Sequence, residues 1–294
     1  MKEKKGFWKV IVFILVLLLA LGEGGWIVVD HLVYHTETVT GVYLSEKEIA
    51  EGLQDDCFEV WYQPIVDSNG VICSAEALSR YRSPDGTVVS PAMFIPVMEG
   101  NGTVEMLDLQ VFAEVCEMQK ERLAEGKECI PVSMNISRCS LTDSEIFTEY
   151  KNILESSAIP VDLVILEITE TVEMDTEEMY SALVPFSEYG FTLEIDDFGS
   201  GYSTFENLLS VDYDGLKIDK SIVDQCETDD GENVITAILE MAENMNMYVI
   251  TEGVETASQA EILIGLGCEQ FQGYYYSAPV EYSDLVLMLD GEEK

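Results

Sequence analysis

The fold is decided by residues 58–81, which read FEVWYQPIVDSNGVICSAEALSRY. Two apolar runs, 58–66 and 71–81, are separated there by Asp67-Ser68-Asn69-Gly70 alone. Four turn-forming residues close a hairpin but cannot contain a crossover helix, so the two strands are predicted to be antiparallel. This hairpin is then an irregularity at the start of the sheet that follows.

The chain beyond the hairpin alternates short apolar runs with stretches long enough for a helix. Further strands are predicted at 130–136, 163–168, 191–195, 215–218, 247–254 and 269–272. Helices are predicted between them, for example at 106–125, 175–189, 233–246 and 258–266. Eight strands with intervening helices over about 235 residues favour an α/β fold, a TIM-like (β/α)8 barrel with an antiparallel first strand. An open doubly wound sheet is the alternative that the pattern leaves open.

The first 29 residues predict a hydrophobic helix that precedes the barrel and anchors the chain in a membrane. Residues 10–21 are uninterrupted apolar side chains, and extension to residue 29 gives a span near the roughly 20 residues that a bilayer requires. A cleaved signal peptide is the alternative, with Ala20-Leu21-Gly22 as the small-residue cleavage pattern. We expect residues 30–56 to be a polar connector that becomes helical towards its end, and residues 57–294 to form the folded domain.

The charge balance excludes one class of partner. The chain has 15 lysine and arginine residues against 56 aspartate and glutamate residues, a formal net charge of −41. An acidic body repels polyanions, so we expect no binding of polymeric nucleic acid. Four of the cations, Lys2, Lys4, Lys5 and Lys9, lie in the first nine residues. This flank predicts that the N-terminus of a single span stays inside, which places the domain outside.

The cysteine and histidine contents limit the metal chemistry. Seven cysteines, odd in number and without a CxxC pair, are typical of buried thiols in a reducing compartment. The two histidines, His31 and His35, both precede the predicted domain, so a metal site in the domain must use oxygen ligands. Oxygen ligands favour Mg²⁺, Mn²⁺ or Ca²⁺ over zinc.

Polar side chains stand at or near the ends of seven predicted strands. They are Glu76, Asn135, Glu167, Asp196, Lys217, Glu252 and Gln272. In a closed barrel such ends meet at one mouth, where barrel enzymes place their catalytic groups. Carboxylates crowded in a partly dry mouth repel one another, and two divalent cations, Mg²⁺ or Mn²⁺, would neutralise them. Asn135 adds an amide oxygen, and the adjacent pair Asp196-Asp197 can serve both ions. Two such ions are the usual arrangement for phosphoryl hydrolysis, in which Lys217 can hold the attacking water or a phosphate oxygen.

Nine short segments in order carry the most specific signal. They are YQPIV (62–66), EAL (76–78) followed by Arg80, FIP (94–96) with Glu99, NIS (135–137), LEITE (166–170), IDDFG (195–199), LKID (216–219), EGVET (252–256) and QGY (272–274). Each is weak alone, but together they make the chain resemble the EAL-domain phosphodiesterases, which hydrolyse the bacterial second messenger cyclic di-GMP to linear pGpG. The resemblance runs from about Phe58 to Pro279.

The resemblance implies a role for each matched residue. The first metal is bound by Glu76, Asn135, Glu167 and Asp196. The second metal or the general base involves Asp196, Asp197 and Glu252, while Lys217 orients the water. Arg80 matches a phosphate contact, and the substrate groove is lined or supported by Gln63, Leu78, Pro96, Asp219, Glu255 and Gln272. Glu170 braces the loop at 197–203, which couples dimer contacts to metal occupancy in the family.

Three functional hypotheses follow, of which the first is an active phosphodiesterase tethered to the membrane. The second is an inert module that only senses cyclic di-GMP, and the third is a barrel enzyme for another phosphodiester. No metal or base position departs from the family pattern, which favours activity over sensing. The resemblance also implies a homodimer. The family function and the unpaired cysteines favour the cytoplasmic side of the membrane for the domain, whereas the N-terminal charge favours the opposite topology.

Overall fold

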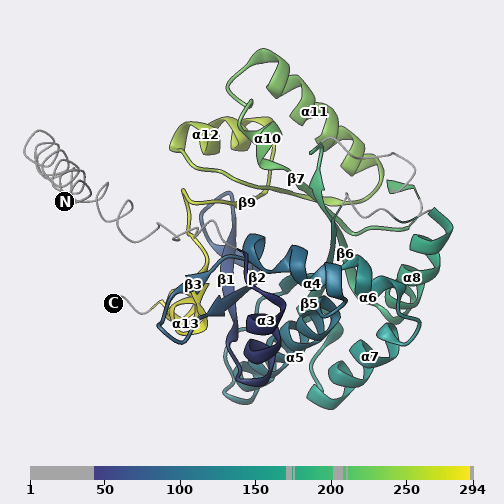
Figure 1. Ribbon diagram of the computed structural model, residues 1–294. Coiled ribbons are helices and arrows are strands. Elements are labelled where there is room, and N and C mark those ends of the chain that lie inside the picture. Colours follow the sequence, from purple (N-terminus) through teal and green to yellow (C-terminus); the bar gives the residue numbers. More distant parts are fainter. Residues whose placement is uncertain (1–42, 170–173, 175, 201–207, 210, 292–294) are drawn as a thin grey trace, which may run out of the picture. The chain divides into compact units, whose positions relative to one another are not determined.

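The computed structural model describes residues 43–169, 174, 176–200, 208, 209 and 211–291. Within these residues eight strands close into a barrel with helices around it (Figure 1). The barrel strands are β1 (Phe58–Asp67), β2 (Ile72–Arg82), β4 (Val132–Asn135), β5 (Val164–Thr169), β6 (Thr192–Phe198), β7 (Gly215–Ile218), β8 (Tyr248–Thr251) and β9 (Gln270–Gln272). Two short strands extend the sheet, since β3 (Val88–Val89) pairs with β2 and β10 (Val280–Glu281) pairs with β1.

The predicted antiparallel first strand is confirmed. β1 pairs antiparallel with both β2 and β9, whereas the remaining neighbours around the barrel are parallel. The turn forms because Asp67 Oδ1 accepts the backbone N–H groups of Asn69 and Val71, at 2.8 and 2.9 Å, and Gly70 takes a φ of 78°. The open doubly wound sheet is wrong, because β1 closes the gap between β2 and β9.

The helices cover the outside of the barrel (Figure 1). They are α3 (Glu46–Gln54), α4 (Ile95–Asn101), α5 (Val104–Ala124), α6 (Arg138–Thr142), α7 (Ile146–Ser157), α8 (Thr176–Tyr189), α10 (Lys220–Val223), α11 (Asp229–Asn244), α12 (Ala257–Leu266) and α13 (Tyr282–Asp290), with 3₁₀ turns η2 (Pro91–Met93) and η3 (Val161–Leu163). α11 begins four residues before the predicted helix at 233–246, because the Thr228 side chain caps it by accepting the Gly231 N–H at 3.0 Å.

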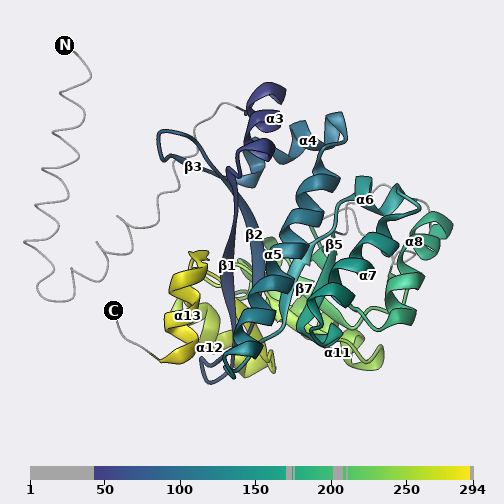
Figure 2. The ribbon, with the colours of Figure 1, turned by 90° about the horizontal axis from the view of Figure 1, so that it is seen from below.

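The core lies between the barrel and these helices. α5 and α7 run side by side along the outside of the strands (Figure 2). Between them and the sheet, the rings of Phe112 and Tyr150 lie 4.4 Å apart, and Phe186 packs edge-on against Tyr150 and Phe191. Each such ring contributes about 2–3 kcal/mol through its burial. The seven cysteines are all free, but only Cys116, Cys226 and Cys268 are buried as predicted, and the other four are half-buried.

The predicted connector ends in α3, which packs against the barrel. Ser45 and Glu48 form a capping box that starts the helix, and Ile49 is fully buried. Gly52 faces the ring of Tyr81 so closely that an added Cβ would lie 2.5 Å from it. The predicted hydrophobic helix at 1–29 lies outside the described residues, and no helix among those described is long and apolar enough to cross a membrane. The division of the chain at 29/30 and 56/57 stays a prediction.

Candidate active site

The parallel strands bring the predicted polar residues to the carboxyl ends of the barrel. Asn135 lies in register with Glu167, and Glu167 with Glu194 on the next strand. Side chains on a strand alternate between faces, so Glu194 and Asp196 share the inward face of β6. Glu167 is fully buried and Asp196 is buried, whereas Asn135 is exposed at the open mouth.

Lys217 stands at the centre of the site. Its side chain is fully buried at the end of β7. Its ammonium nitrogen lies 2.7 Å from a Glu252 carboxylate oxygen, 3.1 Å from Glu167, 3.2 Å from Asp196 and 3.4 Å from Glu76. One cation therefore contacts four carboxylates that come from four different strands or their ends, as convergence on one mouth predicts.

Two side-chain amides, those of Asn135 and Gln272, hold the carboxylate of Glu76 in the site. Asn135 Nδ2 donates to Glu76 Oε1 at 3.3 Å and to Glu167 Oε2 at 3.4 Å. Gln272 Nε2 donates to Glu76 Oε2 at 2.6 Å and to Gln63 Oε1 at 3.2 Å. Each amide thus holds the carboxylate of Glu76 from one side. The buried Oε1 of Glu167 has no hydrogen-bond partner among the described residues, which leaves one oxygen available to a cation.

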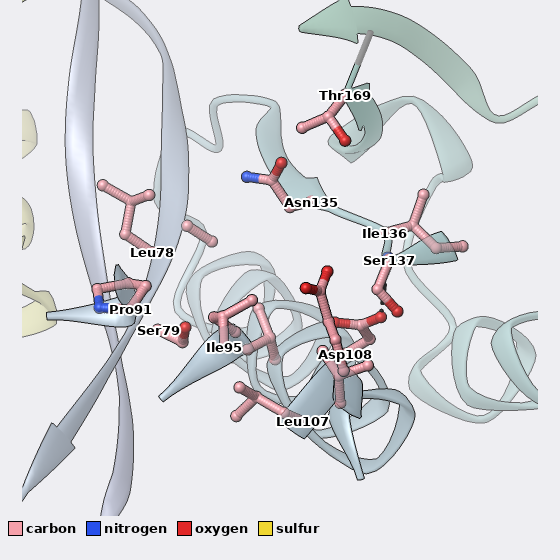
Figure 3. Close-up of a pocket in the computed structure, with 14 residues that line it drawn as sticks. Leu78, Ser79, Pro91, Ile95, Leu107, Asp108, Asn135, Ile136, Ser137 and Thr169 are labelled. Atoms are coloured by element: carbon pink, nitrogen blue, oxygen red, sulfur yellow. Dashed lines mark hydrogen bonds between the residues drawn. The ribbon is translucent and has the colours of Figure 1, made fainter. Parts of the chain in front are cut away.

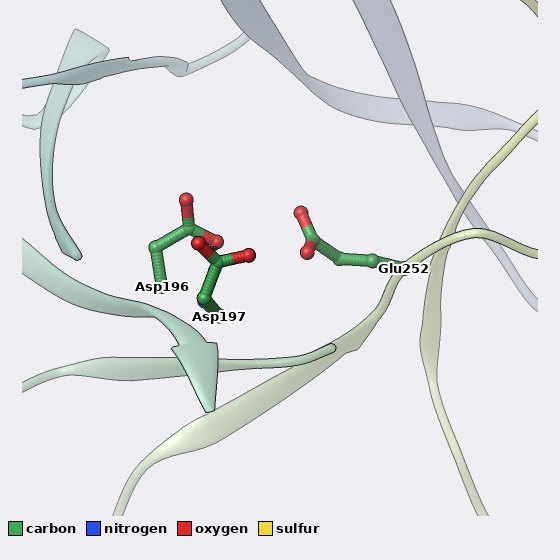
Figure 4. A group of neighbouring side chains, drawn as sticks. All are labelled: Asp196, Asp197 and Glu252. Carbon is green, nitrogen blue, oxygen red and sulfur yellow. Dashed lines mark hydrogen bonds between the residues drawn. The ribbon is translucent and has the colours of Figure 1, made fainter. Parts of the chain in front are cut away.

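A bulge in β6 turns two consecutive carboxylates towards the same space. The register between β6 and β7 shifts between Ile195 and Phe198, and Asp197 adopts a left-handed φ of 58°. Its backbone N–H donates to Asp196 Oδ1 at 2.8 Å. Asp196, Asp197 and Glu252 therefore each offer an oxygen within 4.8 Å of the others (Figure 4). In a regular strand two adjacent side chains would face opposite sides.

The site concentrates negative charge in a poorly hydrated space. Burial raises the pKa of Glu252 to about 8 and that of Asp197 to about 6. Burial also raises the pKa of Glu167 well above its ordinary value. Burial would lower the pKa of Lys217, but Asp196 and the neighbouring carboxylates raise it well above the ordinary value. A single ammonium does not neutralise this cluster, so its donor set of carboxylate and amide oxygens fits Mg²⁺ or Mn²⁺.

The predicted groove residues lie around this centre. Leu78 and Asn135 line a pocket of about 200 Å³ beside the mouth (Figure 3). Arg80 is buried on β2, where its guanidinium lies 5.8 Å from the centre of the Trp61 ring. Pro96 is exposed in the first turn of α4, next to the pocket residue Ile95.

Three more predicted residues have different surroundings from one another: one caps a helix, one forms an exposed ion pair, and one lies outside the described residues. Asp219 caps α10, since its Oδ1 accepts the backbone N–H of Ser221 at 3.0 Å. Glu255, 48% exposed, pairs with Lys220 at 3.2 Å in the loop after β8. Glu170 lies outside the described residues, so its role as a loop brace stays a prediction.

Glu194, a buried carboxyl group beneath the mouth, was not among the residues predicted from the sequence. It is 1% exposed, and Tyr248 donates its hydroxyl to Oε1 across Gly215, where a Cβ would lie 2.5 Å from the Tyr248 ring. Burial raises the pKa of Glu194 to about 7. Its position two residues before Asp196, in the alternating segment TLEIDDF, was the available signal.

Comparison with known proteins agrees with this geometry. The chain is 33% identical over 243 residues to a protein from Pseudomonas aeruginosa named cyclic di-GMP phosphodiesterase NbdA, covering 82% of this chain and 31% of that protein. It is 34% identical over 228 residues to the probable cyclic di-GMP phosphodiesterase PdeB of Escherichia coli, covering 77% and 43%. The chain spans about a third of the length of the first curated relatives that it matches.

Solved structures and a family model give the same relationship. A structure described as the PaMucR phosphodiesterase in complex with c-di-GMP aligns with a TM-score of 0.75 at 29% identity, covering 81% of this chain and 98% of that one. The Bd1971 structure described as an EAL enzyme with cAMP and cyclic di-GMP bound aligns with a TM-score of 0.77 at 30% identity, covering 84% and 68%. The family model of the EAL domain matches residues 46–279. The chain therefore belongs to the EAL domain family.

Proposed function

We propose that this chain is a metal-dependent phosphodiesterase that hydrolyses cyclic di-GMP to linear pGpG. The observation that carries the proposal is the convergence of four carboxylates on the buried ammonium of Lys217, beside the cluster of Asp196, Asp197 and Glu252. The names of the aligned relatives support the substrate. Binding without turnover, the function of an inert sensor module, is the alternative that the test below decides.

The oxygen donors at the mouth would supply ligands for two metal ions. Glu76, Asn135, Glu167 and Asp196 would hold one Mg²⁺ or Mn²⁺ ion, and Asp196, Asp197 and Glu252 would hold or face a second. Bound cations of this kind lower the pKa of water and neutralise charge on a phosphate. Asn135 would offer its amide oxygen to the ion, whereas in the present structure its Nδ2 donates to Glu76 and Glu167.

Two side chains of the protein, Glu252 and Lys217, then accept the proton of the water and orient the water. In the hydrolysis, the water oxygen bonds to phosphorus while the bond from phosphorus to the 3′ oxygen breaks, and a proton passes to the leaving oxygen. Glu252 is placed to accept the proton of the water, because its carboxylate lies within the cluster with Asp196 and Asp197. Lys217, 2.7 Å from Glu252, fixes that carboxylate and orients the water beside it.

Turnover of purified protein with Mg²⁺ or Mn²⁺ tests the proposal. We expect pGpG to form from cyclic di-GMP with either metal and to stop in excess EDTA. Glu76→Gln should lower kcat by at least about 100-fold, because it removes a charged ligand held by two amides. Retained binding of cyclic di-GMP without any product from the wild type would establish the sensor function instead.

We also propose that the chain is a single-pass membrane protein with its domain on the cytoplasmic side, and that it acts as a homodimer. A cytoplasmic domain is where a bacterial second messenger would reach it, although the N-terminal charge favours the opposite side. Reporter fusions at the C-terminus that are active on one side of the membrane decide the topology. Light scattering of the purified protein decides the oligomeric state, and a monomer that retains full turnover would overturn the dimer.

A further inference from the structure

Four polar side chains link α10 and its C-terminal cap to the loop after β8 and the first turn of α12, and we call them the clasp: Lys220, Asp224, Glu255 and Gln259. Lys220 Nζ lies 2.7 Å from Asp224 Oδ1 and 3.2 Å from Glu255 Oε1. Gln259 Nε2 donates to the same Asp224 oxygen at 3.5 Å, and Gln259 Oε1 accepts the backbone N–H of Glu255 at 2.8 Å. The network is closed, because Asp224 contacts both Lys220, which pairs with Glu255, and Gln259, which accepts the Glu255 N–H.

The stem of Lys220 packs against the backbone next to Glu252. Gly253 takes a left-handed φ of 66°, and a Cβ added there would lie 2.4 Å from Lys220 Cγ and 2.6 Å from its Cβ. The Lys220 stem therefore contacts the Cα of the residue that directly follows Glu252. Glycine is required at 253 both for this close approach and for its conformation.

The opposite side of the same loop is held by the sheet. The Glu252 backbone N–H donates to the Ile218 carbonyl at 3.1 Å, and the Val254 N–H donates to the Gln272 carbonyl at 3.0 Å. The loop that carries Glu252 is thus fixed by backbone hydrogen bonds towards the barrel and by the clasp towards solvent. A small shift of this loop would move the Glu252 carboxylate away from Lys217 and from Asp196.

We propose that Lys220 is a positioning residue for Glu252, on which it acts through Gly253 and Glu255. The proposal rests on the proposed function of this site. Exposed ion pairs contribute little to folding stability, and the Lys220 side chain is 43% exposed. We therefore expect the clasp to affect the position of Glu252 rather than the stability of the fold. Residues that orient a metal ligand or base commonly affect metal affinity or activity by about 10- to 100-fold.

Lys220→Met tests the proposal because it keeps most of the stem and removes the charge. In the full chain with Mg²⁺, we expect kcat for cyclic di-GMP to fall about tenfold, with KM within about twofold and the melting temperature within about 2 °C of the wild type. Lys220→Arg should retain at least about half of kcat, because its guanidinium can still pair with Asp224 and Glu255. Lys151→Met, which removes a similarly exposed lysine paired with Glu155, is the matched control and should leave kcat unchanged.

A second measurement separates this proposal from the proposed function. Calorimetric titration with Mn²⁺ should show an affinity about fivefold weaker in Lys220→Met than in Lys151→Met, whether or not the protein turns over cyclic di-GMP. If the wild type yields no product, the proposed function fails, and the Mn²⁺ comparison still decides the role of Lys220. Equal Mn²⁺ affinities in the two variants, or a loss that falls on KM alone, would overturn the positioning role.

Discussion

Replacing Lys217 by methionine removes the one ammonium that the four carboxylates share, while most of the volume of the side chain is kept. The nitrogen is fully buried and lies within 3.4 Å of Glu76, Glu167, Asp196 and Glu252. Each attraction is large on its own, about 4 kcal/mol or more at an effective dielectric constant of 20, but the burial of all five groups offsets most of the sum. Removing one partner from such a buried cluster costs about 3–5 kcal/mol.

Urea unfolding in EDTA at pH 7.5 measures this loss. With a dependence on urea of about 3 kcal/mol per M, the midpoint of Lys217→Met should fall by about 1–2 M. The loss should shrink at pH 6, because burial raises the pKa of Glu252 to about 8, and keeping such a carboxyl group protonated against the ionised unfolded chain costs less at the lower pH. It should also shrink in Mg²⁺, which supplies the missing positive charge.

Lys151→Met is the control for this experiment, since Lys151 forms an exposed ion pair with Glu155 at 3.7 Å. Such a pair contributes at most about 1 kcal/mol. If Lys217→Met and Lys151→Met unfold within about 1 kcal/mol of each other in EDTA, the carboxylates do not depend on Lys217. The central place that we assign to its ammonium would then be wrong.

Two further changes probe the rest of the site. In EDTA, the free energy of unfolding of the wild type should fall from about pH 5 to pH 8, with a slope of about 1.4 kcal/mol per pH unit for each group that titrates. The sign follows because Glu252, with a pKa of 4.5 unfolded and about 8 folded, keeps a proton that the unfolded chain has released; a slope of the opposite sign would contradict it, and excess Mg²⁺ should flatten it. Tyr248→Phe leaves Glu194 Oε1 without its donor and should cost about 1–3 kcal/mol in urea unfolding, whereas Tyr180→Phe, at a tyrosine that is 53% exposed, should cost little.

The parts of the fold that local sequence determines were predictable. The turn at 67–70 is too short for a crossover helix, and this alone makes β1 antiparallel to β2. The strand at 215–218 matches β7 at both ends, because Asp214 and Asp219 bound a short segment that contains the apolar residues Leu216 and Ile218. The meeting of the seven polar residues at one mouth was also predictable, since the carboxyl ends of barrel strands converge there.

The details that depend on contacts across the barrel were not predictable. The sequence placed both Asp196 and Asp197 in the site, but strand alternation alone puts them on opposite faces, and the bulge with its left-handed Asp197 that brings both to the cluster was not foreseen. Alternation with Asp196 indicates that Glu194 faces inward, but its burial depends on Gly215 and Tyr248, which come from two other strands. These arrangements depend on which strands become neighbours, and periodicity within one strand carries no information about the neighbour's side chains.

The excess of acidic residues has different consequences at the surface and at the mouth. On the surface, water and salt screen the charges, so the net charge of −41 mainly repels polyanions. At the mouth, burial removes that screening, and Lys217 is shared by four carboxylates with Asp197 close by. Protons or metal ions must supply the remaining positive charge. The raised pKa values of Glu252 and Asp197 mean that, without metal ions, these carboxylates take up protons more readily than usual. A phosphodiester would add further negative charge, so the proposed binding of cyclic di-GMP depends on metal ions at the mouth, where the acidic residues offer oxygen ligands.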